Sequence, residues 1–160
     1  MEEVKEEVKQ EETVVEPKQT ITNQKLTMSD DIGDLAGALA KAQGQIATVN
    51  KGKQGYGYKF MDFAALVDAV KKPLSDNGLS FIQGHMLVRG KVPAMLGETL
   101  LMHESGQWIK IEMEGIITPM KQLSAIQAQG VSSQYLRRYM LQAILGVAAE
   151  EDTDASLKAK

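Results

Sequence analysis

The feature that most constrains the fold is a run of three strand-like segments followed by one long helical segment. In the last of the three, Ile109, Ile111 and Met113 alternate with charged residues, which predicts a strand with one buried and one solvated face. Short turns separate the segments, and Glu104 to Gln107 is a hairpin turn. We expect strands at about 79–89, 96–103 and 107–117. The pattern predicts an α+β fold in which a three-stranded or slightly larger antiparallel sheet is backed by helices.

Two further helices are expected before the sheet. Ser29, Asp30 or Asp31 can cap the first, whose apolar residues recur at helical spacing as far as Ile46. Asp62 can cap the second, which Asn77-Gly78 closes. The order of elements is therefore helix, basic loop, helix, three strands, helix.

Charge divides the chain into three parts. Residues 1–28 carry seven acids, four bases and no aromatic residue, which predicts a disordered acidic tail. Residues 29–149 form the predicted domain and carry twelve bases against ten acids. Residues 150–160, with four acids and two bases, predict a second, flexible acidic tail. The net charge of −3 therefore does not exclude a polyanionic partner of the domain.

Composition excludes several classes of protein. The chain has 160 residues, enough for one ordinary core, and no cysteine, so disulfides and thiolate metal sites are excluded. No apolar run approaches the roughly 20 residues that span a bilayer. We expect a cytoplasmic protein without a membrane partner.

The last helical segment, residues 130–146, is the first candidate site. No acid occurs between Glu114 and Glu150, whereas Arg137 and Arg138 lie in the middle of the segment. Cations on a helix without internal anions suit a nucleic-acid backbone. A solvated arginine pair is the alternative that the spacing leaves open.

The same helix predicts two faces. One should pack on the sheet and contains Leu136, Tyr139, Met140, Ala143, Ile144 and Val147. The other contains Gln134, Arg137, Arg138, Leu141 and Leu145. Because leucines beside arginines need cover, we predict that Leu141 and Leu145 form an oligomer interface. A helix sandwiched within one chain is the alternative.

The loop 51–60 is the second candidate site. Its lysines Lys51, Lys53 and Lys59 are interleaved with three aromatic residues at alternate positions: Tyr56, Tyr58 and Phe60. Ammonium groups beside stacking rings are the usual means of holding single-stranded nucleic acid, where a stacked base contributes roughly 1–3 kcal/mol. Aromatic residues that merely pin the loop to the core are the alternative for Tyr58 and Phe60.

Catalytic motifs are sparse. There is no P-loop, so ATP-driven strand exchange is not expected. His85 and His103 lack clustered ligands, and we predict no metal site and no cofactor. The acids at 150–154 support an alternative function, a divalent-metal nuclease. A structural oligomer without a DNA role is a third hypothesis.

Several motifs, in order, resemble the phage Erf (essential recombination function) family of single-strand annealing proteins over about residues 30–154. They are Tyr58-Lys-Phe-Met-Asp-Phe63, Lys72-Pro-Leu74, Asn77-Gly-Leu-Ser80, Leu100 through Trp108, Gln129-Gly130, Tyr135-Leu-Arg-Arg-Tyr-Met-Leu141, Leu145-Gly-Val147 and Glu151-Asp152. Where the family usually has Thr-Tyr-Ala-Arg-Arg-Tyr, this chain has Gln134-Tyr-Leu-Arg-Arg-Tyr139 after Ser133.

The resemblance implies a protein that coats single-stranded DNA as a ring or helical filament and pairs complementary strands without nucleotide hydrolysis. It also implies a strand-strand-strand-helix core. We therefore expect a homo-oligomer of phage origin, with an annealed duplex as intermediate and a phage exonuclease or host single-strand binding protein as candidate partners. The expected DNA-binding residues are Arg137, Arg138, Lys51, Lys53, Lys59, Tyr56, Tyr58, Gln134 and Tyr135.

Overall fold

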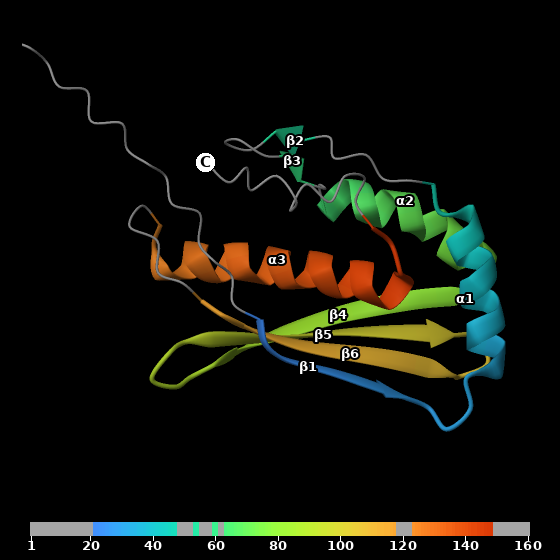
Figure 1. The fold of residues 1–160 in the computed structure, drawn as a ribbon, viewed down its shortest axis with the longest axis horizontal. Helices are drawn as coiled ribbons and strands as arrows, with labels where there is room; N and C mark the ends of the chain where they lie inside the picture. Colours follow the sequence, from blue (N-terminus) through green and yellow to red (C-terminus); the bar gives the residue numbers. More distant parts are fainter. Residues whose placement is uncertain (1–20, 48–52, 55–58, 61–62, 118–122, 149–160) are drawn as a thin grey trace, which may run out of the picture.

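A computed structural model describes residues 21–47, 53–54, 59–60, 63–117 and 123–148 (Figure 1). Its elements are, in chain order, β1 (Ile21–Met28), α1 (Gly33–Gln45), β2 (Lys53–Gln54), β3 (Lys59–Phe60), α2 (Phe63–Asp76), β4 (Leu79–Val88), β5 (Ala94–His103), β6 (Trp108–Ile116) and α3 (Ala125–Leu145). The predicted α+β fold is confirmed.

One antiparallel sheet organises the described residues. Its strand order is β1-β6-β5-β4, and all three neighbouring pairs are antiparallel. The three strands expected from the sequence are β4, β5 and β6, which differ from their predicted bounds by at most two residues. Helix α3 lies along one face of this sheet, and we call this face the helix side (Figure 1). Helix α1 crosses one end of the strands.

The fourth strand, β1, corrects the prediction of a tail over residues 1–28. Residues 21–28 pair with β6, for example Lys25 with Glu112. Beyond β1, Ser29 continues the pairing, because its amide donates to the Trp108 carbonyl oxygen at 3.0 Å. A polar edge strand resembles a tail in sequence, since most of its side chains face solvent and the strand with which it pairs is some 85 residues away along the chain. Residues 1–20 lie outside the described residues.

Deletion of residues 1–28 is therefore expected to lower the free energy of unfolding by roughly 2–4 kcal/mol, because each lost ladder hydrogen bond contributes about 0.5–1.5 kcal/mol. Deletion of residues 1–20 alone is the matched control, since it keeps β1. Urea denaturation followed by circular dichroism would compare the two. Identical midpoints for both truncated chains would contradict the place of β1 in the sheet.

Helix α3 approaches the sheet closely where two glycines face it. A Cβ atom built on Gly97 would lie 2.6 Å from Met140 Cε and 3.5 Å from Leu136 Cβ. One built on Gly115, on the neighbouring strand, would lie 3.3 Å from Leu136 Cδ2. Leu136 and Met140 are both buried, so the missing side chains of β5 and β6 make the space that they fill.

The far side of α3 corrects a second prediction. Leu141 and Leu145 have no exposed surface within the single chain, where they join one core cluster with apolar residues of α1 and α2. The Gln43 side chain of α1 also donates to the Leu145 carbonyl oxygen at 2.9 Å. The prediction that these leucines need a second subunit to cover them is wrong, because the C-terminal half of α3 is sandwiched between the sheet and the chain's own helices.

The ends of α3 follow local sequence signals. Ser124 and Gln127 form a capping box at its start, and Gly146, with φ of 63°, ends it in the left-handed conformation. The helix thus begins before the predicted segment and closes at the predicted glycine. The proposed Asp62 cap of α2 lies outside the described residues.

Candidate nucleic-acid interface

The candidate interface lies on the flank and outer surface of α3, away from its close contact with β5 and β6. Helix α3 contains no acidic residue, and Arg137 and Arg138 are its only charged residues. Both arginines are half-buried, and each guanidinium lies over aromatic rings. Since consecutive helical residues point about 100° apart, the two arginines have different surroundings.

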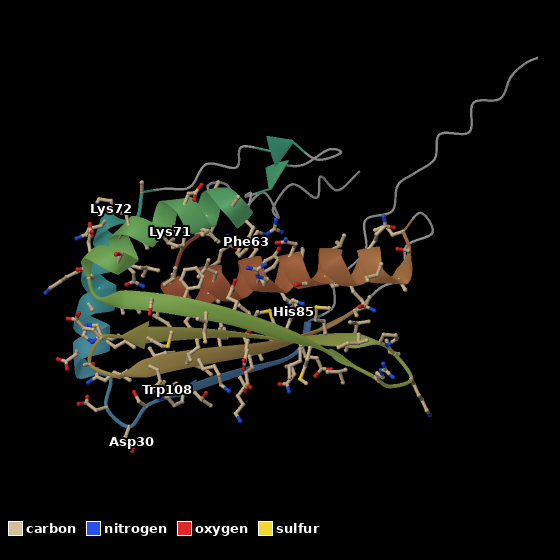
Figure 2. The ribbon with its side chains drawn as sticks, turned by 180° about the vertical axis from the view of Figure 1, so that it is seen from behind. Asp30, Phe63, Lys71, Lys72, His85 and Trp108 are labelled. Atoms are coloured by element: carbon tan, nitrogen blue, oxygen red, sulfur yellow. The ribbon has the colours of Figure 1, made fainter. Side chains whose placement is uncertain are left out.

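Arg137 is held between α3, β4 and α2. Its Nε donates to Gln83 Oε1 at 3.2 Å, while Gln83 Nε2 donates to the Arg137 carbonyl oxygen at 2.9 Å. Gln83 Nε2 also lies 2.8 Å from the buried Thr99 Oγ1. The guanidinium carbon lies 4.7 Å from the centre of the Phe63 ring, at the start of α2 (Figure 2). Arg137 is therefore a positioned cation that also ties three elements together.

Arg138 belongs to what we call the Arg138 cluster, made of Tyr135, Arg138 and Tyr139. The guanidinium carbon lies 5.3 Å from the centre of each tyrosine ring, within the range of a cation–π interaction. The two rings are 4.4 Å apart at an angle of 45°, and the Tyr135 hydroxyl donates to the Tyr139 hydroxyl at 2.9 Å. The cluster combines a cation with two aromatic surfaces on one stretch of helix.

Tyr139 and Ala143 belong to the face that the sequence pattern predicts to pack on the sheet, but the structure leaves both exposed. The exposed fraction of Tyr139 is 36%. The sheet contact uses Leu136 and Met140 instead, and Tyr139 lies at the border of that face. Its i, i+4 spacing from Tyr135 is the sequence signal that identifies the cluster. The predicted site residue Gln134 is exposed on the same helix.

The predicted basic loop is described in part. Strands β2 and β3 form a two-stranded antiparallel pair in which Lys53 is opposite Phe60 and Gln54 is opposite Lys59. This pairing places the backbone of two predicted lysines on adjacent strands. Lys51, Tyr56 and Tyr58 lie outside the described residues. The hairpin lies on the helix side of the sheet, beyond α2 (Figure 1).

Among the other titratable groups of the described part, Lys110 on the sheet lies 3.0 Å from Glu112 and 4.0 Å from Glu98, whereas each histidine contacts a serine. His85 Nδ1 lies 3.3 Å from Ser133 Oγ, and His103 Nδ1 lies 2.9 Å from Ser105 Oγ at the hairpin turn. Among the described residues there is no group of three or more His, Cys, Asp or Glu residues that could hold a metal ion. The acids at 150–154 lie outside these residues. In the same described part, no helix has the length and apolar character needed to cross a membrane.

Fold and site together define an α+β protein that carries a cationic, acid-free helix on an antiparallel sheet. A family model described as the ERF superfamily matches residues 35–160, which include both arginines, and the chain belongs to this superfamily. Membership indicates a function in recombination by annealing of single strands. No curated protein and no solved structure matches the chain significantly.

The hydrogen bond between Arg137 and Gln83 yields a stability prediction. Arg137→Lys keeps the charge but removes the Nε donor and the planar group above Phe63, so we expect a loss of about 1 kcal/mol of unfolding free energy. In a Gln83→Ala background the same substitution should cost markedly less, because the acceptor is already absent. Urea denaturation of the parental protein, the two single variants and the double variant measures the loss of unfolding free energy in each background. An equal loss in both backgrounds would show that this hydrogen bond does not stabilise the fold.

Proposed function

We propose that the protein binds single-stranded DNA along α3 and anneals complementary strands in ATP-independent homologous recombination. One observation carries the proposal: Arg137 and Arg138 are positioned by aromatic rings on a helix without a single acid. Membership of the ERF superfamily supports the same function.

The arginines suit phosphate groups. A guanidinium presents five donors in a planar fork that matches phosphate oxygens, and it stays charged at physiological pH. The Nε of Arg137 already donates to Gln83, so its contacts with phosphate would come from the two terminal nitrogens. Fixing the guanidinium in advance lowers the conformational entropy lost on binding.

The Arg138 cluster adds aromatic surface to the charge. Tyr135 and Tyr139 offer rings on which a base or sugar can stack, and stacking does not depend on base identity. A strand held by its backbone and by stacking leaves its Watson–Crick edges open to a second strand. Annealing then needs no fuel, because the duplex has the lower free energy.

The β2–β3 hairpin extends this surface. Phe60 precedes Phe63 by three residues, so the two Cα atoms are separated by at most about 11 Å. Phe63 in turn contacts Arg137. The covalent connection therefore keeps the basic loop near α3, and Lys51, Lys53, Lys59, Tyr56 and Tyr58 complete the DNA-binding set that we propose.

The proposal includes the setting of the protein. It acts as a homo-oligomer, a ring or helical filament, in the cytoplasm of a bacterial host and is of phage or prophage origin. The annealed duplex is its product complex, and a phage exonuclease or host single-strand binding protein is a candidate partner. No nucleotide or metal cofactor is part of the proposed reaction.

An annealing assay with labelled complementary oligonucleotides tests this function. Arg138→Ala should slow annealing and reduce the slope of log affinity against log salt by about 0.7, the contribution of one phosphate contact to a single strand. Lys71→Ala is the matched control: it removes the same charge from an exposed position of α2 about 12 Å along the helix from Phe63. It should leave both quantities unchanged.

Two results would contradict the proposal. Equal affinity and equal salt slope for the parental protein and Arg138→Ala would remove α3 from the binding surface. Cleavage of the oligonucleotides in magnesium would instead favour the nuclease hypothesis for the acids at 150–154.

A further inference from the structure

The free edge of β4 lacks the features by which proteins keep an edge strand from pairing. Its ten residues contain no charged side chain and no proline, and its register with β5 is regular throughout. Large apolar side chains in its second half are exposed, Met86 to 60% and Leu87 to 38%. Exposed edges of soluble proteins usually carry lysine, proline or a bulge, and an edge without them is a pairing site for another strand.

The opposite edge of the sheet, β1, is polar over residues 23–25 and has a register irregularity after Ile21, but its last residues include the exposed apolar side chains of Leu26 and Met28. Leu26 is 57% exposed and Met28 is 45% exposed. Their cross-strand partners on β6 are Ile111, which belongs to the core, and Ile109, which packs against it. Both partners lie on the helix side of the sheet. The helices make their main contacts with β4, β5 and β6, so α3 does not reach over this edge. Among the described residues, therefore, neither the β4 edge nor the β1 edge is paired with another strand or covered by a helix.

At both edges, the residues whose backbone N–H and C=O groups point away from the sheet carry their side chains on the same face of the sheet. The Glu104 amide donates to the Gly78 carbonyl oxygen at 3.0 Å, so the even-numbered residue Gly78 is hydrogen-bonded toward β5. Hydrogen-bonded pairs alternate along an antiparallel ladder. The odd-numbered residues of β4 therefore point their backbone N–H and C=O groups outward, away from β5. The Ser29 amide bonds to Trp108, so even-numbered residues of β1 point theirs outward. On both edges these outward residues, such as Leu87 and Leu26, carry side chains on the helix side.

We propose that β4 of one copy pairs antiparallel with β1 of the next, so that subunits assemble by continuing the sheet. Within one subunit β1 and β4 already run in opposite directions, as antiparallel pairing between copies requires. Because the outward residues of both edges face the helix side, every copy places α3 on the same side of the joined sheet. The arginine-bearing helices of successive subunits then form one continuous row.

The contact is heterologous, since two different edges meet, and such contacts generate rings or open filaments. A two-fold pairing of β4 with β4 of a second copy would also satisfy the backbone. It would leave Leu26 and Met28 of both copies exposed, whereas pairing of β4 with β1 covers the exposed apolar residues of both edges. The proposal names the surfaces of the oligomer in the proposed function, but it rests on the sheet edges and not on DNA binding.

Edge-specific proline substitutions test the proposal without DNA. Leu87→Pro and Leu26→Pro each remove an outward N–H and place a ring on the edge, while the ladders with β5 and β6 keep their donors. Size-exclusion chromatography with light scattering should show an oligomer for the parental protein and single chains for either variant. A 1:1 mixture of the two variants should form a dimer of two chains and nothing larger, because one intact β4 edge and one intact β1 edge remain.

Every other pattern overturns the proposal. A parental protein that is monomeric, or variants that keep its oligomer size, would exclude edge pairing as the basis of assembly. A Leu26→Pro protein that remains a dimer would indicate two-fold pairing through β4, and mixed variants that stay monomeric would exclude the heterologous contact.

Lysine variants distinguish loss of edge pairing from misfolding caused by proline. Leu87→Lys and Leu26→Lys keep the backbone donor and place a charge at an exposed position, so each subunit stays folded while the paired edge is disfavoured. Circular dichroism would verify the fold, and the lysine pair should reproduce the result of the proline pair. Arg138→Ala should keep the parental oligomer size. Failure of DNA binding and failure of edge pairing are therefore separate results.

Discussion

The contact of α3 with two glycines of the sheet is the constraint on which the rest of the structure depends. Side chains at Gly97 and Gly115 would occupy the space that Leu136 and Met140 fill, so their absence lets the helix lie directly on β5 and β6. This contact fixes the rotation of α3 about its own axis. With Leu136 and Met140 turned inward, Arg137 and Arg138 have to lie on the flanks and outer surface of the helix.

The two halves of α3 have different surroundings as a result. In the C-terminal half, α1 and α2 bury Leu141 and Leu145, and no part of these side chains is available to a partner. Further toward the N-terminus the outer surface carries the arginines and Tyr139. The hydrogen bond from Arg137 to Gln83 and its contact with Phe63 join this region to the helix layer. The geometry therefore concentrates both the charge and the exposed aromatic surface in the middle of the helix.

Periodicity in the sequence predicts the elements that have a strong internal pattern, and it misses contacts made by distant segments. The alternation in residues 107–117 identifies β6, but no local signal pairs residues 21–28 with it. The two faces of α3 are equally ambiguous, because spacing shows that Leu141 and Leu145 need cover and cannot show which helices provide it. Tyr139 was misplaced for the same reason: its exposure depends on how the glycines of the sheet set the rotation of α3.

The central claim is that single-stranded DNA lies along the outer surface of α3 and not on the opposite face of the sheet, where Trp108 lies (Figure 2). The most direct measurement is photo-cross-linking of a bromouracil-substituted single strand, with the attachment site identified by mass spectrometry. Tyr135, Tyr139 and Trp108 offer aromatic targets on the two opposite faces. The account predicts attachment to α3 at Tyr135 or Tyr139. Attachment at Trp108 with none on α3 would contradict it.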